Sequence, residues 1–293
     1  MRIPELFKEG KTVLSFEIFP PKKTSSIDTI YNTLDELSDL NPAFISVTYG
    51  AGGNTADSKT CQIASVIQDK YNITSAAHLT CVNCTKNDID VILGQLKEKG
   101  IQNILALRGD INPDIPPKHD FKYASELVTY IKEHGDFSVS GACYPEGHME
   151  TESIIDDIKH LKIKVDAGAD HLMSQLFFDN SHFYDFLEKA RIAGIDVPIE
   201  AGIMPVINKN QIERMVSMCG ASLPVKFTKM MQKYEHNPEA LRDAGIAYAI
   251  DQIVDLISNG VDGIHLYTMN NPYVARRISE SISSCLLYTS DAA

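Results

Sequence analysis

The stretch VLSFEIFPPKKTSSIDTIYNTLDELSDLNPAFISVTYG, residues 13–50, decides the fold. It begins with an apolar run at 13–19 and ends with a second at 43–50. Between them Ile30, Leu34 and Leu37 recur at helical spacing, and Ser25 or Ser26 is placed to cap that helix. Near-continuous apolar runs fit strands that are buried on both faces, so the stretch predicts one β-α-β unit of a parallel sheet.

The same alternation continues along the rest of the chain. Six further apolar runs of this kind begin at Thr74, Asn103, Phe137, Asp170, Val197 and Asp262. The segment between residues 208 and 260 is long enough for more than one helix. Eight strand-helix units predict an α/β fold of the (β/α)8 TIM-barrel type, a single domain with extra helices in the seventh unit.

Local signals predict where some of the helices begin and end. Thr85 and Asp88 have the spacing of a capping box. One amphipathic stripe consists of Ile154, Ile155, Ile158, Leu161 and Val165. Glycines are expected just after helix ends, and four follow such stripes: Gly100, Gly168, Gly194 and Gly260.

Bulk properties narrow the class of protein. The 293 residues carry a net charge of -12, which argues against nucleic acid or an anionic membrane as the partner. No apolar run approaches the roughly 20 residues of a membrane span, and the N-terminus lacks the apolar stretch of a signal peptide, so we expect a cytoplasmic protein. The barrel should occupy residues 1–284. The tail at 285–293 ends in LLYTSDAA, fits neither helix nor strand, and is interpreted as a sequencing or cloning scar.

Several motif-based functions have no support in the sequence. Cys81 and Cys84 form a C-x-x-C, but no second pair or suitably spaced histidines accompany it, so we expect no metal site and reduced, structural thiols. The chain has neither a P-loop nor a G-x-G-x-x-G fingerprint. Any dinucleotide would therefore bind by a route outside the Rossmann fold.

The ends of the predicted strands are unusually polar. In this fold catalytic groups lie at the C-terminal ends of strands. Glu17, within FEIFPP, is a candidate general acid or base, and a surface salt bridge is the alternative. Arg108, Gly109 and Asp110 could contact a large cofactor, or could form a turn with a local ion pair. The other polar strand ends are Thr48 with Tyr49, His78, Tyr144 with Glu146 and His148, Gln175, and Tyr267.

A polar helix face follows the fifth strand. Asp157, His160 and Lys164 are spaced three and four residues apart, so they share one side of the helix. The histidine and lysine could meet a diphosphate and the aspartate a sugar hydroxyl. A solvated polar face is the alternative.

The order of motifs resembles the bacterial methylenetetrahydrofolate reductases over residues 3–283. The shared motifs are FEIFPPK, FISVTYGAGG, AAHLTC, LALRGD, ACYPEGH, KVDAGAD, QLFFD, PIEAGIMPV and IHLYTMN. The resemblance implies a barrel that binds FAD at its strand ends. It assigns Glu17 as the general acid, Asp110 as the group that tunes the flavin, and Gln175 as a folate contact.

The resemblance also implies the remaining site residues. The residues that match FAD contacts are Thr48, Tyr49, His78, Arg108, Gly109, Asp110, Tyr123, Ala124, Tyr144, His148, Asp157, His160 and Lys164. The substrate contacts implied are Glu17, Thr48, Gln175, Met231 and Tyr267. Met231 stands where the family often carries a phenylalanine that stacks on either substrate, and Phe227 and Tyr234 are nearby.

The implied reaction is the FAD-dependent reduction of 5,10-methylenetetrahydrofolate to 5-methyltetrahydrofolate by NADH or NADPH, in a ping-pong sequence that feeds methionine biosynthesis. Members of the family usually associate, so we expect a homo-oligomer. Two alternatives are a folate reductase that receives electrons from a partner subunit or ferredoxin, and a flavin-free barrel that only binds folate.

Overall fold

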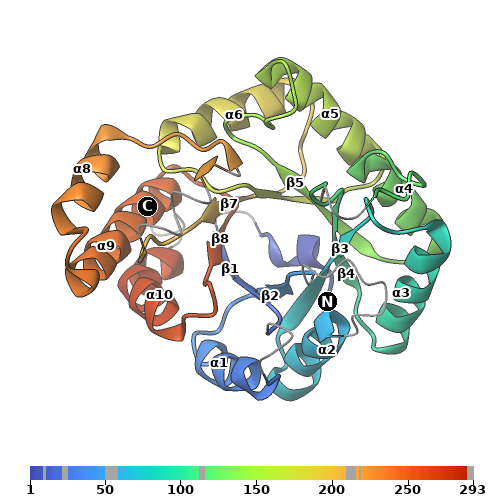
Figure 1. Ribbon diagram of the computed structural model, residues 1–293, viewed down its shortest axis with the longest axis horizontal. Helices are drawn as coiled ribbons and strands as arrows, with labels where there is room; N and C mark the ends of the chain where they lie inside the picture. The colour runs from blue at the N-terminus through green and yellow to red at the C-terminus, as the bar shows by residue number, and fades with distance from the viewer. Residues whose placement is uncertain are drawn as a thin grey trace. The chain divides into compact units, whose positions relative to one another are not determined.

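The computed structural model describes residues 1–8, 11–21, 26–49, 59–111, 116–208, 216–217 and 219–288. Eight parallel strands form a closed barrel in sequence order, β1 to β8, which confirms the predicted (β/α)8 fold (Figure 1). The strands are β1 Val13–Ile18, β2 Phe44–Val47, β3 Thr74–Thr80, β4 Asn103–Leu107, β5 Ser138–Cys143, β6 His171–Ser174, β7 Ile199–Ile203 and β8 Gly263–Tyr267.

A helix follows most of the strands in the described chain. The helices are α1 Asp28–Ser38, α2 Lys59–Tyr71, α3 Lys86–Glu98, α4 Ala124–His134, α5 Ile154–Asp166, α6 Asn180–Ile192, α8 Val225–Tyr234, α9 Pro238–Ser258 and α10 Pro272–Leu287, and a short 3-10 helix, η1, spans Ile3–Leu6. Because α8 and α9 both lie between β7 and β8, the predicted extra helix in the seventh unit is confirmed.

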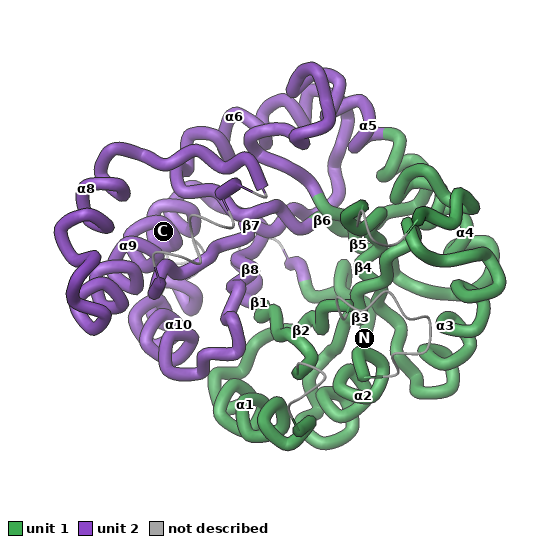
Figure 2. The backbone as a smooth tube through the Cα atoms, in the orientation of Figure 1, with its two compact units in different colours: residues 1–6, 15–142, 163–172 green, residues 7–14, 143–162, 173–293 purple. Residues whose placement is uncertain are grey.

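The chain divides into two compact units (Figure 2). Unit 1 contains residues 1–6, 15–142 and 163–172, and unit 2 contains residues 7–14, 143–162 and 173–293. Unit 1 holds most of β1 and all of β2, β3 and β4, whereas unit 2 holds β7, β8 and the helices α6, α8, α9 and α10. The predicted domain boundary at residue 284 stays a prediction. The expectation that the tail from residue 285 fits no helix was wrong at its start, because α10 continues to Leu287.

The register of unit 1 sets the heights of its polar side chains. Glu17 of β1 is level with Ser46 of β2, and Ser46 is level with Ala76 of β3. His78, two residues beyond Ala76, is level with Leu105 of β4. Side chains alternate along a strand, so Glu17 and His78 point away from the fully buried Phe16, Ile18 and Leu79 of the same strands.

Most of the predicted helix signals are confirmed. Thr85 and Asp88 form the reciprocal capping box at the start of α3. All four predicted C-terminal glycines have positive φ angles, between 66° and 115°.

Two helix predictions were wrong in detail. The N-cap position of α1 is Ile27, although the Ser26 hydroxyl accepts a hydrogen bond from Asp28 N at 3.2 Å; Ser25 lies outside the described residues. Ile155 is 53% exposed, because it lies about 100° around the helix from Ile154, beyond the edge of the buried face formed by Asp157, Ile158 and Leu161.

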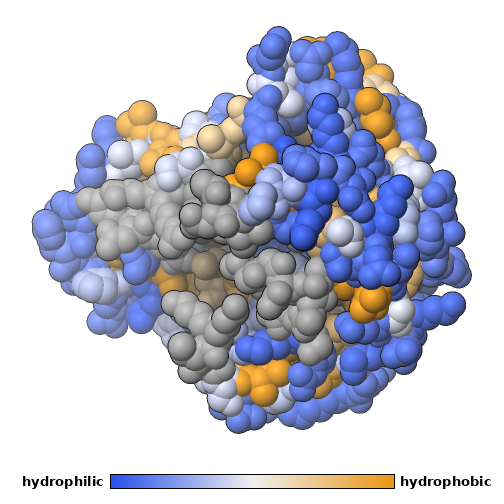
Figure 3. All heavy atoms as spheres, turned by 45° about the vertical axis from the view of Figure 1, so that its right-hand side comes forward, coloured by the Kyte–Doolittle hydropathy of each residue, from blue (hydrophilic) through white to orange (hydrophobic). Residues whose placement is uncertain are grey.

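One face of the surface shows how hydrophilic and hydrophobic side chains are distributed. The face that carries α3 and α4 is mainly hydrophilic, with separate hydrophobic side chains (Figure 3). None of the described helices combines the length and apolar character that crossing a bilayer requires.

Candidate functional site

A buried acid and a buried histidine meet at the strand ends of unit 1. Glu17 is 7% exposed and His78 is 6% exposed. Oε2 of Glu17 lies 3.5 Å from Nε2 of His78. This is an ion-pair separation, and it places a buried carboxyl group, a side chain of the kind that serves as a general acid, beside an imidazole. The alternative of a surface salt bridge for Glu17 is wrong, because the side chain is not at the surface.

The end of β2 lies directly beside this pair. The amide nitrogen of Thr48 donates to the carbonyl oxygen of Ile18 at 3.0 Å, so Thr48 adjoins the residue that follows Glu17. The hydroxyl of Thr60 donates to the carbonyl oxygen of Thr48 at 2.9 Å and fixes the strand end from α2. Thr48 and Tyr49 are both half-buried. The structure therefore brings the predicted residues of β1, β2 and β3 together.

The end of β4 is shaped by Gly109. Its φ of +86° is in the left-handed region, and a Cβ atom there would lie 3.1 Å from Cβ of Thr80. The carbonyl oxygen of Arg108 accepts a hydrogen bond from Val82 N at 2.8 Å, which ties β4 to the segment after β3. Arg108 is half-buried and Asp110 is exposed. Backbone conformation and packing on Thr80 thus explain why glycine separates these two charged side chains.

Lys164 brings a positive charge to the end of β5. Its Nζ donates to the carbonyl oxygen of Ala142 at 2.6 Å. The side chain runs along Gly141, where a Cβ atom would lie 2.7 Å from Cδ of the lysine. A larger residue at 141 would therefore displace the lysine from the strand end.

The other predicted cofactor residues of the helices differ in exposure. On α5, Asp157 is buried whereas His160 is exposed. Tyr123, which precedes α4, is 50% exposed, and the Lys122 ammonium lies 5.0 Å from its ring centroid. Ala124 is half-buried at the first position of α4. These residues offer polar and aromatic groups at the start of α4 and along α5.

In unit 2, the connection after β5 presents two aromatic rings. Tyr144 and His148 are packed edge to face, with centroids 4.7 Å apart and an interplanar angle of 89°. Nδ1 of His148 accepts a hydrogen bond from Glu150 N at 3.1 Å, so Nε2 is the nitrogen that can face a ligand. Both rings are half-buried. This arrangement suits contact with a planar or anionic group.

The predicted substrate residues of unit 2 share one hydrophobic cluster, which we call the α8 cluster. Tyr267 packs against it, and its hydroxyl donates to the carbonyl oxygen of Ser174 at 2.7 Å. Gln175 adjoins it, because its Oε1 accepts a hydrogen bond from Leu176 N at 2.9 Å. The buried members are Leu176, Phe178, Met204, Val206, Ala221, Phe227, Met231 and Leu241.

Met231 and its neighbours are mostly turned into this cluster. Met231 is 7% exposed and Phe227 is fully buried, with its ring stacked on Phe178 at a centroid distance of 4.6 Å. Of the three candidates in this segment, Tyr234 is the most exposed, at 37%. The inner face of α8 is therefore first of all a packing surface against α9 and the segment that follows β6.

The C-x-x-C motif lies next to the end of β4. The amide nitrogen of Cys81 donates to the carbonyl oxygen of Arg108 at 3.2 Å. Both thiols are buried and unbridged, and burial raises the pKa of Cys81 to about 12 and that of Cys84 to about 11. Within the described ranges no three His, Cys, Asp or Glu side chains group as a metal site.

Sequence patterns did not single out two other polar side chains near the site. His182 of α6 and Ser222, which precedes α8, both meet Glu146 in unit 2. No motif or periodicity marks them, since they lie 36 or more residues from Glu146 and only the fold brings them to it.

Comparison with known proteins gives the same family as the motifs. The family model described as methylenetetrahydrofolate reductase matches residues 2–283. The 5,10-methylenetetrahydrofolate reductase of Escherichia coli is 37% identical over 274 residues, which cover 94% of this chain and 92% of that protein. Methylenetetrahydrofolate reductase 1 of Schizosaccharomyces pombe is 37% identical over 278 residues, or 93% of this chain. The chain spans only 46% of the length of that yeast relative.

A solved structure shares the fold at low sequence identity. It is an uncharacterized protein from Clostridium thermocellum that binds two copies of 5-methyl-5,6,7,8-tetrahydrofolic acid. The TM-score is 0.66 at 14% identity, with 95% of this chain and 96% of that chain covered. At this identity the likeness supports the barrel architecture.

Proposed function

The chain belongs to the methylenetetrahydrofolate reductase family, and from this premise we propose that it reduces 5,10-methylenetetrahydrofolate to 5-methyltetrahydrofolate, with FAD as cofactor and NADH or NADPH as electron donor. The observation that carries the proposal is the buried carboxyl of Glu17 beside the imidazole of His78 at the strand ends. A buried acid at this place suits a reaction that needs a proton delivered to a bound substrate.

The donor set of the strand ends fits FAD. The chain is acidic overall, yet Arg108 and Lys164 place two permanent positive charges at the ends of β4 and β5 in unit 1. Such charges suit a diphosphate. In unit 2, the edge-to-face pair of Tyr144 and His148 suits contact with a ring or an anionic group.

The other proposed FAD contacts lie on the strand ends and on α4 and α5. They are Thr48, Tyr49, His78, Gly109, Asp110, Tyr123, Ala124, Asp157 and His160. When bound, FAD supplies hydride transfer, and the protein supplies orientation and charge.

Glu17 is the proposed proton donor. Protonation of the folate opens its five-membered ring and leaves a 5-iminium cation, which is the form that accepts a hydride. His78, whose Nε2 lies 3.5 Å from the carboxyl, is the group placed to orient it. Burial of both side chains keeps bulk water away from this transfer.

The other proposed substrate contacts come from both units. Thr48 follows β2, Gln175 follows β6, Met231 belongs to α8 and Tyr267 ends β8. The hydroxyl of Tyr267 is engaged with the Ser174 backbone, so its ring is the part that can face the folate. We propose that the nicotinamide and the folate occupy the site in turn, as a ping-pong sequence requires.

An anaerobic absorbance titration tests the proposal. The purified chain, loaded with FAD, should show a flavin band that NADH or NADPH bleaches and that methylenetetrahydrofolate restores. A flavin band that neither nicotinamide bleaches would indicate electrons from a partner subunit or ferredoxin. Failure to bind FAD at all would contradict the reductase proposal and would favour a barrel that only binds folate.

A further inference from the structure

Three segments of unit 2 meet at a polar cluster outside the proposed site. Glu146 lies between β5 and α5, His182 on α6, and Ser222 just before α8. Ser222 N donates to both carboxylate oxygens of Glu146, at 3.0 and 3.2 Å. Nε2 of His182 lies 3.2 Å from the Ser222 hydroxyl and 3.7 Å from Oε2 of Glu146. We call these three residues the 146–182–222 clamp.

The composition of the clamp suggests a hydrolytic triad, but its geometry excludes one. In a catalytic triad the histidine contacts the nucleophile and the acid through opposite ring nitrogens. Here the same nitrogen, Nε2 of His182, faces both Ser222 and Glu146. Proton transfer from the hydroxyl through the ring to the acid is therefore not available, and the cluster is a structural connection.

A second contact joins the same two segments. Gly220 has a φ of +70°, and a Cβ atom there would lie 3.0 Å from Cγ of Met149. Residues 146–149 and residues 220–222 thus touch at two points, one polar and one apolar. The glutamate side chain at the polar point is only 16% exposed, so water screens its hydrogen bonds weakly.

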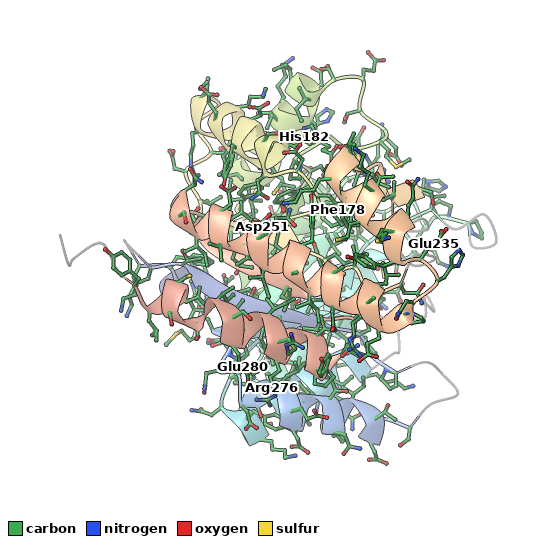
Figure 4. All side chains as sticks on the ribbon, turned by 90° about the vertical axis from the view of Figure 1, so that its left-hand side faces the viewer. Phe178, His182, Glu235, Asp251, Arg276 and Glu280 are labelled. Carbon is green, nitrogen blue, oxygen red and sulfur yellow. The ribbon has the colours of Figure 1, made fainter. Side chains whose placement is uncertain are left out.

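The clamp connects the two functional parts of unit 2. On one side Glu146 stands between Tyr144 and His148, the proposed cofactor contacts. On the other side Ser222 leads into α8, which carries Met231 and packs into the α8 cluster. Figure 4 shows this side of unit 2, with His182 on α6, Phe178 below it and Asp251 on α9.

Other attachments of α8 are to α9 and to the segment that follows β6. Lys226 donates to Asp251 of α9 at 2.7 Å, but both side chains are about 70% exposed, so this pair adds little. The ring of Phe227 packs on Phe178 and Tyr248. The clamp, together with the contact between Met149 and Gly220, ties the segment before α8 to the connection after β5.

We infer that Glu146 is a positioning residue that holds the start of α8 against the β5–α5 connection and so sets the affinity for the folate substrate. The inference rests on the proposed function for its substrate, but the contact itself does not. Loss of the carboxylate leaves Ser222 N without its acceptor and loosens residues 219–234. The segment that carries Met231 then has to be ordered when substrate binds, which raises KM for the folate more than it lowers kcat.

The test compares three variants of the FAD-loaded protein. Glu146→Ala removes both hydrogen bonds and should raise KM for methylenetetrahydrofolate about tenfold, with kcat changed less than about threefold. Glu146→Gln keeps one acceptor oxygen and should recover most of that loss. Ser222→Ala keeps the backbone donor and removes only the hydroxyl contact to His182, so its KM should stay within about twofold.

Hydrogen exchange gives a readout that does not depend on activity. In Glu146→Ala the amides of 219–234 should exchange faster, whereas those of α10 should not change. Glu280→Gln is the matched control. The Glu280 carboxylate is 62% exposed, and its ion pair with Arg276 on the same helix, at 3.8 Å, is weak. Figure 4 shows this pair on α10, away from His182.

The outcomes separate the two proposals. Unchanged exchange at 219–234 in Glu146→Ala would overturn the clamp, and faster exchange with an unchanged folate KM would overturn its role in affinity. A parent protein that does not reduce the folate at all would overturn the proposed function, while the exchange experiment would still decide whether the clamp holds α8.

Discussion

The carboxylates at the starts of the strands differ from those at the strand ends. At the start of β6, Asp170 accepts hydrogen bonds from Ser138 Oγ and Val139 N and pairs with Lys132 at 2.9 Å. At the start of β8, Asp262 accepts from Ile199 N at 2.9 Å and pairs with Arg191 at 3.0 Å. Each links its strand to the preceding strand and to a basic side chain of the helix that comes before that preceding strand.

The strand-end carboxylates have a different environment. Glu17 is buried beside His78. Asp110 is exposed and follows Gly109, whose left-handed backbone conformation favours glycine. The comparison teaches that an acidic residue near a strand is not by itself a functional signal. Asp170 and Asp262, at strand starts, accept hydrogen bonds from backbone amides and so link neighbouring strands. Glu17 and Asp110, at strand ends, lie where this fold carries its catalytic groups, and we propose chemical roles for them.

The largest effect is expected for Glu17→Gln. Loss of the proposed proton donor should lower the rate of folate reduction by about 100-fold to 10,000-fold. Because glutamine has nearly the same shape, FAD binding and NADH oxidation with an artificial acceptor should persist. Steady-state rates with each acceptor measure this, and a variant that reduces the folate at the parent rate would contradict the role of Glu17.

Asp262→Ala should act on stability instead. The substitution leaves Ile199 N and Arg191 without their partner, which should lower the free energy of unfolding by about 1–3 kcal/mol. The ratio of folate reduction to NADH oxidation with an artificial acceptor should not change, because Asp262 is at the opposite end of β8 from Tyr267. Urea unfolding measures the first quantity. Equal stability of variant and parent would remove the distinction between strand starts and strand ends.

Gly109→Ala tests the backbone between the two charged residues of β4. A side chain at a φ of +86° costs about 1–2 kcal/mol, and the new Cβ would also press on Thr80. We expect a lower unfolding free energy together with weaker FAD binding, because Arg108 would shift. Gly94, whose Cβ would meet nothing within 4 Å, offers the matched control, Gly94→Ala. Equal FAD affinity in the two variants would count against Arg108 as a cofactor contact.

Asp110→Asn should change the flavin potential. A negative charge near the flavin disfavours the added negative charge of the reduced state, so its removal should raise the midpoint potential. For an exposed charge worth about 1 kcal/mol the rise is roughly 20 mV for a two-electron couple. Redox titration against a dye of known potential measures it, and an unchanged or lower midpoint would argue that Asp110 does not face the flavin.

The smallest effect is expected for alkylation of the C-x-x-C. Burial raises the pKa of Cys81 to about 12 and that of Cys84 to about 11, so very little thiolate is present at pH 8. Both should resist iodoacetamide in the native protein, while the partly exposed Cys219 and Cys285 react first. Mass spectrometry of peptides reports this. Early labelling of Cys81 would mean that the segment beside Arg108 opens readily.

The sequence predicted the barrel because its signals are local. Eight apolar runs, the Thr85 capping box and four helix-ending glycines each report the conformation of a few neighbouring residues. Local signals failed at three places. Ile155 was counted with the apolar stripe of α5 although it is exposed, the α1 cap was expected one residue early, and α10 continues past residue 284 to Leu287.

The site was only partly readable. Polar residues at strand ends identified Glu17, His78 and Arg108, since the fold places such residues on one face. The distance between Glu17 and His78, the packing of Met231 into the α8 cluster and the support of Lys164 by Ala142 depend on register and helix docking. A motif records residue types and spacing, but it specifies neither the strand register nor the way the helices dock.

The sequence by itself determined the eight strand-helix units, their order and the family. Local backbone preference and hydrophobic periodicity act over a few neighbouring residues, so both can be recognised directly in the sequence. Tertiary structure alone decided which polar side chains meet. Glu146, His182 and Ser222 are brought within hydrogen-bonding or ion-pair distance by the packing of separate segments, and no short-range preference specifies such a meeting.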